Sequence, residues 1–440
     1  MKRQKSIKPE VWLVTESMGY GHQRAAWPLR HIARGGIIIV NDYPGIPESD
    51  KKIFHDLESF YNSISKFKKV PIIGELAFKI YDQFQKIPPY IPGKDMSSPT
   101  FQVRAATNLI LRKKWGKHLI DTLAKEQPEG KPLPFLTTFF TPAFFADLHG
   151  YPGDIFCIIC DTEISRDWVA KDPLKSRIRY FVPTERAFER LKSYGVPPER
   201  IRLSGFPLPL ENLGDNNFDI LREDLSKRLV LLDPLKVFIK KNRKILNENK
   251  ISIVSKVSRP LTITYAVGGA GAQKEIGIAI AKSFKEEIKI KKIKLVLVAG
   301  IHHNLYEYFQ KELTKLDLSY AEILYEPDKY SYFEKFNKLL RTTDILWTKP
   351  SELSFYVALG IPLIMSSTIG SQEDYNQKWL LKIDAGVSMP KETDIKKWFF
   401  DILQKGRFAE LALNGFLNAE KRGTLNIIES INRIEKGLPW

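Results

Sequence analysis

Cysteine is scarce in this sequence, and long apolar runs are absent. Its 440 residues include two cysteines, Cys157 and Cys160, with strand-like flanks. A four-ligand zinc site would need a second cysteine pair or distant histidines, so we interpret both as buried strand residues. No stretch approaches the roughly 18 apolar residues of a membrane-spanning helix, and the apolar segment 11–15 after the basic N-terminus is too short for a signal-peptide core. These absences predict a cytoplasmic protein that does not cross a membrane.

Positive charge, in contrast, is abundant. The formal net charge is +17 and the sequence pI is about 9.5. Such a charge favours an anionic partner, whether a phosphate ligand, an anionic lipid surface or nucleic acid, and charge alone does not choose among them. At 440 residues the chain exceeds the usual size of a single hydrophobic core, so two domains are expected.

Short apolar segments alternate with helical patterns along most of the chain. This alternation is typical of α/β proteins whose parallel sheet is covered by helices on both faces. The expected strands are 11–15, 37–40, 136–140, 155–159, 180–182, 201–203, 261–266, 295–299, 345–347 and 363–365. The expected helices include 23–31 and 184–194, a capped helix from Ser351 and a helical tail from about Asp394. A polar loop after the strand 363–365 is expected to present Gln372, Glu373 and Asn376.

Two segments interrupt this alternation. Residues 51–118 are rich in aromatic residues and lysines, and two interpretations stay open: helices that cover the sheet, or an amphipathic surface for acceptor entry or anionic lipid. Residues 215–258 contain a basic cluster at 240–244 and few strand signals. We therefore expect an interdomain connection there, with one or two helices.

A glycine-rich turn follows the first strand of each half. Residues 268–272 lie between a strand and a helix, where backbone amides and the helix N-terminus favour an anion. They match neither the Walker pattern nor GxGxxG. Two interpretations of this loop stay open: a cradle for a diphosphate, or merely a tight turn. In the first turn, Gly19 and Gly21 begin a dinucleotide fingerprint and Asp42 follows at about the distance of a ribose-binding acid, but Arg24 replaces the third glycine.

Histidines occur near two of these strand ends. His22 lies where the first helix should begin, and a helix N-terminus disfavours the imidazolium, leaving a neutral ring able to accept a proton near pH 7. A catalytic base and a structural histidine are the alternatives. His302 and His303 follow Gly300 at a later strand end, and because adjacent side chains diverge, a loop role is expected rather than a metal site.

Several motifs resemble, in the same order, those of the GT-B glycosyltransferases that include monogalactosyldiacylglycerol synthase, bacterial diacylglycerol glucosyltransferases and the lipid II N-acetylglucosaminyltransferase. Gly19-Tyr-Gly-His22 resembles the GGGH element after their first strand, and Asp161 with Trp168 resembles their Asp-to-Trp segment. The other matching stretches are Phe181 to Pro207, the loop 268–271, Thr348-Lys-Pro350, Gly360-Ile-Pro362 and Gln372-Glu-Asp-Tyr-Asn376.

The resemblance implies a GT-B architecture, with two facing Rossmann-like doubly wound domains and a cleft between them. It also implies inverting, metal-independent transfer of a sugar from a UDP-sugar to an acceptor hydroxyl, with no cofactor. His22 would be the catalytic base. The implied acceptor-binding residues are Gly19, Tyr20, Gly21, Asp161 and Trp168. The implied donor-binding residues are Gly268, Gly269, Ala270, Gly271, Ala272, Gly300, Ser351, Glu352, Gly370, Ser371, Gln372, Glu373 and Asn376.

The sequence departs from the family pattern at three positions. Phe355 stands where relatives place a ribose-binding glutamate, and Glu352, one helical turn earlier, is expected either to reach the ribose or only to cap its helix. Ser165 replaces a histidine of the lipid-glycosylating relatives, which weakens the transfer of lipid specificity. Tyr20 replaces a glycine and would narrow or reshape the acceptor cleft.

These observations predict an acceptor-binding domain at 1–214, a basic connection at 215–258, a nucleotide-sugar-binding domain at 259–423 and a C-terminal helix at 424–440 that crosses back to the first domain. The predicted activity is that of a UDP-sugar-dependent hexosyltransferase. A lipid or membrane-associated acceptor is favoured, with peripheral attachment to an anionic inner membrane face as an option and no nucleic-acid partner. The alternatives are a nucleotide-sugar epimerase of the same fold, a dinucleotide-dependent oxidoreductase and a non-catalytic nucleotide-sugar-binding protein.

Overall fold

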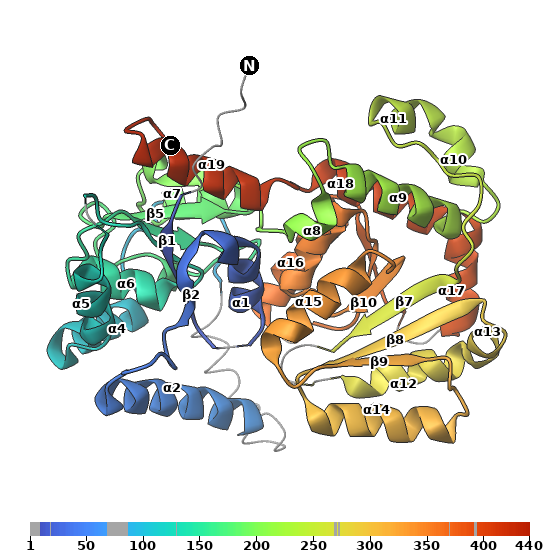
Figure 1. Cartoon of the computed structure of the whole chain (residues 1–440), viewed down its shortest axis with the longest axis horizontal. Helices are drawn as coiled ribbons and strands as arrows, with labels where there is room; N and C mark the ends of the chain where they lie inside the picture. The colour runs from blue at the N-terminus through green and yellow to red at the C-terminus, as the bar shows by residue number, and fades with distance from the viewer. Residues whose placement is uncertain are drawn as a thin grey trace. The chain divides into compact units, whose positions relative to one another are not determined.

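The chain is built on two parallel β-sheets, each with six strands (Figure 1). The computed structural model describes residues 9–17, 19–67, 87–128, 130–267, 271, 273–368, 370–390 and 394–440. Two compact units result: unit 1 comprises 1–207, 370–372 and 422–440, and unit 2 comprises 208–369 and 373–421. Since strands within each sheet are parallel, helices must carry the chain back between them. The predicted α/β class with two Rossmann-like sheets is confirmed.

The first sheet has the order β2-β1-β3-β4-β5-β6. Its strands are β1 (Val11–Thr15), β2 (Ala33–Ile39), β3 (Phe135–Thr137), β4 (Ile155–Ile158), β5 (Ile178–Val182) and β6 (Ile201–Leu203). Strand β1 is an inner strand, with Leu13 opposite Ile37 of β2 on one side and Leu136 of β3 on the other. The carboxyl ends of β1 and β3 therefore lie next to each other.

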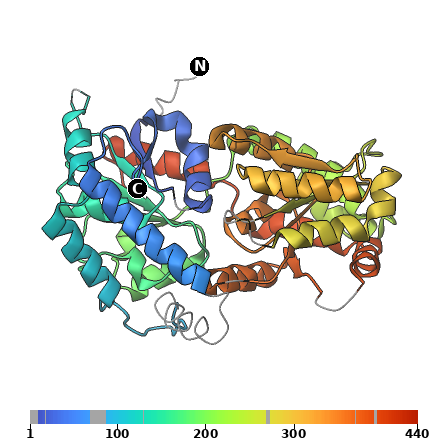
Figure 2. The same ribbon diagram turned by 90° about the horizontal axis from the view of Figure 1, so that it is seen from below.

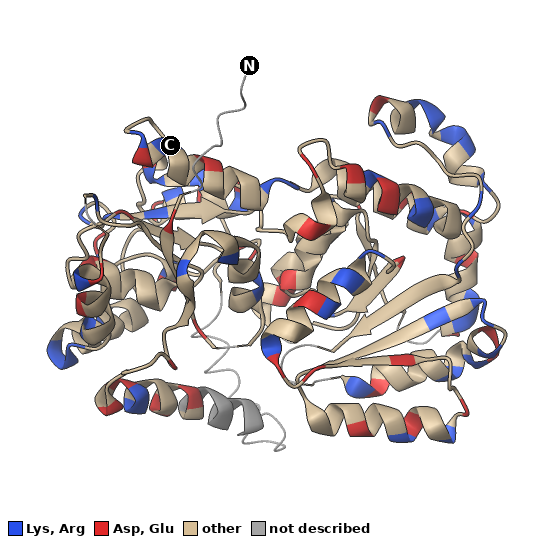
Figure 3. Ribbon diagram, in the orientation of Figure 1, with Lys and Arg blue, Asp and Glu red and all other residues tan. Residues whose placement is uncertain are grey.

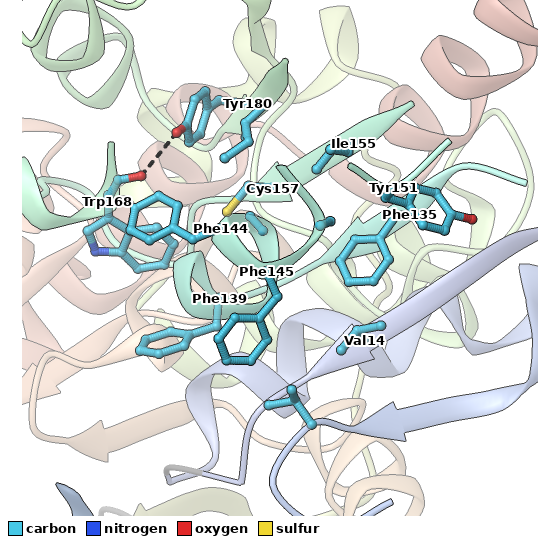
Figure 4. Packing of buried hydrophobic residues seen from close by; sticks show 14 of the residues in the cluster. Val14, Phe135, Phe139, Phe144, Phe145, Tyr151, Ile155, Cys157, Trp168 and Tyr180 are labelled. Atoms are coloured by element: carbon cyan, nitrogen blue, oxygen red, sulfur yellow. Dashed lines mark hydrogen bonds between the residues drawn. The ribbon is translucent and has the colours of Figure 1, made fainter. Parts of the chain in front are cut away.

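Alternate residues of these strands form two separate cores, one on each face of the sheet. Val14 and Cys157 belong to one core, whereas Leu13 and Phe156 belong to the other. Figure 4 shows part of the first core, in which phenylalanines and Tyr151 pack around the sheet residues. Because side chains alternate with a period of two along a strand, apolar residues at every position indicate a sheet buried on both faces.

The helices of unit 1 cover these two faces. They are α1 (Gly21–Ala26), η1 (Trp27–Ile32), α2 (Glu48–Phe67), α4 (Phe101–Lys113), α5 (Lys117–Lys125), α6 (Phe140–Leu148), η2 (Arg166–Trp168), α7 (Glu185–Ser193), η3 (Pro198–Arg200) and α19 (Gly423–Glu435). The hydroxyls of Thr100 and Thr184 accept hydrogen bonds from backbone amides in the first turns of α4 and α7. The predicted helix 23–31 is instead α1 followed by a 3₁₀ turn, because Pro28 cannot donate to an α-helical ladder.

The aromatic segment 51–118 contributes α2, α4 and the start of α5. Phe54 of α2 packs edge-on against Trp115 with ring centroids 4.9 Å apart, and Trp115 in turn contacts Phe145 at 4.8 Å. In the described part of this segment, the helices thus cover one face of the first sheet. The residues at 68–86, which include many of its lysines, lie outside the described residues.

The second sheet has the order β12-β11-β10-β7-β8-β9. Its strands are β7 (Leu261–Ala266), β8 (Ile293–Gly300), β9 (Glu322–Tyr325), β10 (Ile345–Thr348), β11 (Leu363–Met365) and β12 (Gly386–Ser388). The sequence did not predict β9 and β12, which occupy the two edges. Edge strands are short and half-exposed, so they lack the continuous apolar run of the central strands.

The helices of unit 2 follow the same alternation. They are α8 (Leu210–Leu213), α9 (Asp219–Leu232), α10 (Val237–Lys241), α11 (Arg243–Glu248), α12 (Lys274–Ser283), α13 (Lys285–Lys289), α14 (His303–Lys315), α15 (Lys329–Leu340), η4 (Glu352–Leu359), α16 (Ser371–Lys382), α17 (Ile395–Gln404) and α18 (Arg407–Asn418). Figures 1 and 2 show α12 and α14 side by side along the second sheet. None of the described helices has the length and apolar character needed to span a membrane.

Residues 215–258 contain α9, α10 and α11, three helices where one or two were predicted, and they lie within unit 2. The buried Arg228 of α9 donates hydrogen bonds to the backbone carbonyls of Thr343 at 2.8 Å and Leu359 at 2.9 Å. This anchors α9 to the body of unit 2. Figure 3 shows acidic and basic residues interspersed along α9 and α14, so neither helix presents charge of one sign only.

Helix α19 completes the core of unit 1 from the far end of the chain. Ile427 and Ile431 are fully buried in the core that contains Val11, Leu13 and Phe156. The Asn426 side chain also donates a 2.8 Å hydrogen bond to the carbonyl of Ser204. One face of the first sheet is thus covered by a helix that comes after unit 2 in the sequence.

We expect Ile427→Ala to lower the free energy of unfolding of unit 1 by about 2–5 kcal/mol, because it removes three buried carbons and leaves a cavity against the sheet. Urea unfolding followed by tryptophan fluorescence measures this. The control is Glu429→Ala on the same helix, whose side chain is 60% exposed and should cost at most about 1 kcal/mol. Equal losses in the two variants would contradict the role assigned to α19.

Candidate functional site

His22 lies in the first turn of α1, directly after the turn that follows β1. Gly19 within this turn has φ +79°, a backbone conformation that favours glycine. The Nδ1 atom of His22 lies 2.9 Å from the carbonyl oxygen of Thr138, at the end of β3. Because a carbonyl can only accept, Nδ1 carries the hydrogen and donates. The Nε2 atom is therefore left as the acceptor of the ring.

Burial keeps the His22 ring neutral. Loss of hydration lowers the pKa of His22 to about 4, although its bond to the Thr138 carbonyl acts in the opposite direction. The sequence predicted a neutral ring from the helix N-terminus, but the larger cause is the surrounding protein. At pH 7 the ring is thus an uncharged group with one free nitrogen lone pair.

Aromatic rings surround His22 on one side. Its ring centroid lies 4.5 Å from that of Phe139 and 6.0 Å from that of Trp168. Trp168 is itself fixed, since its carbonyl oxygen accepts a 3.1 Å hydrogen bond from the buried Tyr180 hydroxyl (Figure 4). The structure therefore brings His22 and Trp168 together, although they are far apart in sequence.

The other predicted acceptor residues lie around the same two strand ends. Gly19, Tyr20 and Gly21 form the turn and the start of α1, and the Tyr20 ring is almost completely buried beneath the Arg24 guanidinium at 5.6 Å. Asp161 follows β4 and is partly exposed. The Tyr20 side chain is thus packed into unit 1 at this turn rather than exposed.

Asn41, which sequence reasoning missed, ties the end of β2 to the same turn. Its Oδ1 accepts a 3.0 Å hydrogen bond from the backbone amide of Ser17. Asp42, proposed for ribose binding in the dinucleotide alternative, is exposed in the next position. An asparagine directly after a predicted strand was the signal that could have identified it.

An apolar pocket of about 270 Å³ opens beside this turn in unit 1. We call it the Glu16 pocket, and its apolar walls include Phe54, Ile110, Trp115, Phe139, Phe140 and Phe144. Glu16, the first residue after β1, also lines it and is only 6% exposed. Burial, with a further contribution from the charge of Glu58, raises the pKa of Glu16 to about 8. Glu16 is therefore largely a neutral carboxylic acid at pH 7.

In unit 2, the loop after β7 carries the predicted diphosphate cradle. Gly268, Gly269, Ala270 and Ala272 lie outside the described residues, and Gly271 has φ +69°. Gln273, which the prediction did not include, holds the end of this loop. Its side chain accepts a 2.8 Å bond from the Ser366 hydroxyl and donates a 2.9 Å bond to the Ser367 carbonyl. The loop is thereby tied to the carboxyl end of β11.

The Thr348-Lys349-Pro350 stretch is bound to helix α16. Lys349 and Glu373 form an ion pair, and the buried Asn376 amide donates a 3.2 Å hydrogen bond to the Pro350 carbonyl. Gln372, Glu373 and Asn376 were predicted in a polar loop, but α16 already begins at Ser371, directly after Gly370. Acidic residues at 373 and 374 favour a helix start here because they interact with the helix dipole.

The segment after Ser351 is a 3₁₀ helix, η4, rather than the predicted capped α-helix. Ser351 precedes it without a side-chain capping bond. Because residues three apart are eclipsed in a 3₁₀ helix, Glu352 lies one turn before Phe355 on the same side. Phe355 is buried against Trp379 with ring centroids 5.3 Å apart, whereas Glu352 is partly exposed. Of these two residues on the same side of η4, Glu352 is thus the one accessible to solvent.

The other histidine and cysteine positions considered from the sequence lie after β8 and in or just after β4. Gly300 ends β8 with φ +65°, and His303 begins α14, 3.3 Å from Glu307 on the helix surface. Among the described residues, no three metal-binding side chains gather at one point. Cys157 and Cys160 are both buried, as predicted, and neither is in a disulfide, but Cys160 lies two residues beyond the end of β4 rather than in the strand. Burial raises the pKa of the Cys157 thiol well above its usual value.

The buried Glu16 gives a testable dependence of stability on pH. An unfolded glutamate loses its proton near pH 4.5 and the folded Glu16 near pH 8, so the folded state holds more protons between these values and its stability falls as pH rises. Glu16→Gln removes this effect. We expect its stability relative to wild type to rise by about 3 kcal/mol from pH 5 to pH 8 in urea unfolding. If the difference in unfolding free energy between Glu16→Gln and the wild type stays constant from pH 5 to pH 8, Glu16 is already ionised in the folded protein.

Comparison with known proteins covers parts of both units. A family model described as "Domain of unknown function (DUF6938)" matches residues 242–335. The relatives include processive diacylglycerol beta-glucosyltransferases of Bacillus cereus (strain G9842), 24% identical over 55% of this chain, and of Bacillus cytotoxicus, 24% identical over 56%. These matches cover 51% and 53% of the respective relatives, so the chain spans about half the length of the curated relatives it matches.

Among solved structures, a putative UDP-N-acetylglucosamine 2-epimerase from Listeria monocytogenes superposes with a TM-score of 0.52 at 10% identity, covering 97% of each chain. At this identity the likeness shows the fold alone. The resemblance predicted from the motifs is confirmed: at low sequence identity, the chain is similar to the diacylglycerol glucosyltransferases of the GT-B group.

Proposed function

We propose that this protein is an inverting, metal-independent glycosyltransferase that moves a sugar from a UDP-sugar to an acceptor hydroxyl. One observation carries the proposal. His22 is neutral, and its Nδ1–H is fixed to the Thr138 carbonyl at 2.9 Å, which leaves Nε2 as a base at the end of β1. The carboxyl ends of parallel strands are the usual ligand-binding edge of α/β sheets.

In the proposed reaction, Nε2 of His22 accepts the proton of the acceptor hydroxyl. The hydroxyl oxygen forms a bond to the anomeric carbon while the bond from that carbon to the diphosphate breaks, and UDP departs with the electron pair. A pKa near 4 makes His22 a weak base in the free protein. The negative charge of a bound diphosphate would raise this pKa towards neutrality, because a nearby anion favours the imidazolium.

The donor would bind to unit 2. Amides of the loop 268–272 and the N-terminus of α12 would stabilise the departing diphosphate. Glu352 would accept hydrogen bonds from the ribose hydroxyls, and Gln372 and Glu373 would contact the sugar. Asn376 would brace this region through its bond to the Pro350 carbonyl. Ser351, Gly300 and Gly370 would border the same site.

The acceptor would bind to unit 1, and we propose a lipid or membrane-associated molecule. Two observations support this: the relatives are named diacylglycerol beta-glucosyltransferases, and an apolar pocket adjoins Phe139, which packs against His22. The net charge of +17 would further favour peripheral attachment to an anionic membrane face. Because Ser165 replaces the relatives' histidine, we do not assign the head group of the acceptor lipid.

We expect UDP to raise the melting temperature, since a ligand that binds only the folded state stabilises it by mass action. His22→Ala should keep this increase and lose roughly 10²–10⁴-fold in transfer to lipid extract, because it removes the base and not the donor site. Thermal shift and radiolabelled product formation measure the two effects. His55→Ala, with a side chain 78% exposed on α2, is the matched control and should retain activity.

Two outcomes would contradict the proposal. Full transfer by His22→Ala would exclude His22 as the base. Conversion of a UDP-sugar to its epimer in the absence of any acceptor would instead indicate an epimerase, the enzyme class named for the Listeria structure.

A further inference from the structure

The short helices α10 and α11 lie beyond the end of α9 at the periphery of unit 2 (Figure 1), and we call residues 234–250 the α10–α11 surface. Three of its large apolar side chains, Leu235, Val237 and Ile245, are 61%, 50% and 39% exposed. No other stretch of eleven residues in the described part of the chain holds three exposed side chains of this kind. A cluster of exposed apolar groups, unlike a single one, indicates contact with another molecule.

Cations surround these apolar side chains. They are Lys236, Lys240, Lys241, Arg243, Lys244 and Lys250, all of them exposed, and Glu248 is the single acidic residue between 234 and 250. Of these cations, only Lys244 has an ion-pair partner among the described residues, Glu248 at 3.9 Å. Figure 3 shows the predominance of basic residues on α10 and α11, in contrast to the mixed charges of α9. The α10–α11 surface therefore presents positive charge that the chain itself does not neutralise.

The apolar and cationic side chains share one side of α10. Lys240 and Lys241 follow Val237 by three and four residues, so the three side chains are neighbours on the helix surface. Phe238 points away from them into unit 2, where it is buried so close to Gly406 that a Cβ on that glycine would come within 2.9 Å of its side chain. The exposed side of α10 is thus both apolar and basic.

The backbone that carries this surface is held in place. Leu246 of α11 is buried, and the Arg222 side chain of α9 donates a 3.1 Å hydrogen bond to the carbonyl of Asn249. The Ser226 hydroxyl, also on α9, donates a 2.5 Å bond to the carbonyl of Ser252. Because the exposed side chains project from a fixed backbone, little ordering of the chain is needed when a partner binds.

The side chains of this surface define the chemistry of its partner. The unpaired cations favour phosphate groups or other anions. The exposed apolar groups are aliphatic, and the single aromatic residue of the stretch, Phe238, is buried, so the stacking platform typical of proteins that bind single-stranded nucleic acid is absent from this stretch. Aliphatic side chains among lysines suit the interface of a bilayer, where phosphates lie directly above hydrocarbon.

We propose that the α10–α11 surface docks onto an anionic phospholipid bilayer, with Leu235, Val237 and Ile245 entering the acyl boundary while the surrounding cations contact lipid phosphates. The choice of a membrane as the partner rests on the proposed function, and the residues of unit 2 that make the contact are what this inference adds. Docking involves neither the UDP-sugar nor the acceptor, so it can be tested without either.

The test is co-sedimentation of the full chain with two kinds of vesicle: phosphatidylcholine alone, and equal parts of phosphatidylcholine and phosphatidylglycerol. We expect at least about tenfold tighter binding to the anionic vesicles, since each lysine or arginine at such a surface adds attraction. Added salt should weaken this binding because it screens the charges. Equal binding to both kinds of vesicle would overturn the proposal.

Lys240→Glu combined with Lys241→Glu tests the position of the contact, and should weaken binding to the anionic vesicles at least about tenfold. The matched control is Lys311→Glu with Lys315→Glu on α14, which reverses two exposed lysines of the same unit. Charges outside the contact are screened, so the control should stay within about twofold of wild type. Equal losses would show that net charge alone attracts the protein, and would overturn the proposal.

If the charge reversals disrupt α10, Lys240→Ala with Lys241→Ala preserves the helix, because alanine is a strong helix former. This variant should weaken binding at least about fivefold. Binding as tight as that of the wild type would likewise contradict the proposal.

Leu235→Ser combined with Val237→Ser tests the apolar contact. It should weaken binding to the anionic vesicles at least about tenfold, and the loss should persist at high salt because burial of apolar surface is not screened. The control is Ile290→Ser, since Ile290 is 70% exposed in unit 2 outside the α10–α11 surface. Equal binding by the two variants would exclude insertion and overturn the proposal.

A single-stranded oligonucleotide provides the comparison with a different polyanion. We expect it to bind more weakly than the anionic vesicles and to be unaffected by the Leu235→Ser and Val237→Ser pair. Tighter binding of the oligonucleotide, lost in the Lys240 and Lys241 variants, would assign the surface to nucleic acid and contradict the proposal. A failure of UDP binding or of sugar transfer would leave the vesicle results unchanged and would count only against the proposed function.

Discussion

The contact between His22 and Thr138 links α1, which follows β1, to the end of the neighbouring strand β3, at the edge of the first sheet where a ligand is expected. Thr138 follows β3, its carbonyl accepts the His22 Nδ1 hydrogen, and its hydroxyl is hydrogen-bonded to Thr15 at the end of β1 at 2.8 Å. The pairing of β1 with β3 fixes both partners, so the imidazole tautomer is determined by backbone geometry. The state of His22 thus depends on the fold as a whole, and the proposed chemistry depends on that state.

In unit 2, too, side-chain hydrogen bonds and an ion pair connect the segments that follow neighbouring strands. The Thr348 hydroxyl donates a 2.9 Å bond to the Ala266 carbonyl, joining β10 to β7, and Gln273 links the loop after β7 to the residues after β11. The Lys349–Glu373 pair then fixes α16 to the residues after β10. These short polar links hold loop segments that have no extensive apolar core of their own.

Sequence reasoning predicted the parts of the fold whose causes are local. The central strands appeared because they are buried on both faces and therefore read as continuous apolar runs. The edge strands β9 and β12 were missed because half-exposed edges lack this signal. The helix expected at 23–31 is divided at Trp27, because Pro28 cannot donate to an α-helical ladder. The polar loop expected at 372–376 is instead part of α16, because Glu373 and Asp374 favour a helix start.

The candidate site was only partly predictable for the same reason. His22 and Trp168 could be named from motifs, but their proximity, with ring centroids 6.0 Å apart, arises from strand order. Nothing in the sequence around Glu16 indicates its role, because its unusual protonation comes from α2, α4 and α6, which approach it only in the folded chain. When a carboxyl group is buried by segments that are distant in sequence, the residues next to it in the chain show no pattern that would reveal the burial.

The central claim is that His22 is a neutral imidazole with its hydrogen on Nδ1. Nitrogen-15 NMR of histidine-labelled protein measures both ring nitrogens directly across a pH titration. With His55 and the other histidines assigned by substitution, we predict that His22 shows a protonated Nδ1 and an unprotonated Nε2 from pH 5 to pH 8, because its pKa is about 4. A His22 signal that titrates near pH 6.5, or a hydrogen on Nε2 at neutral pH, would contradict the account.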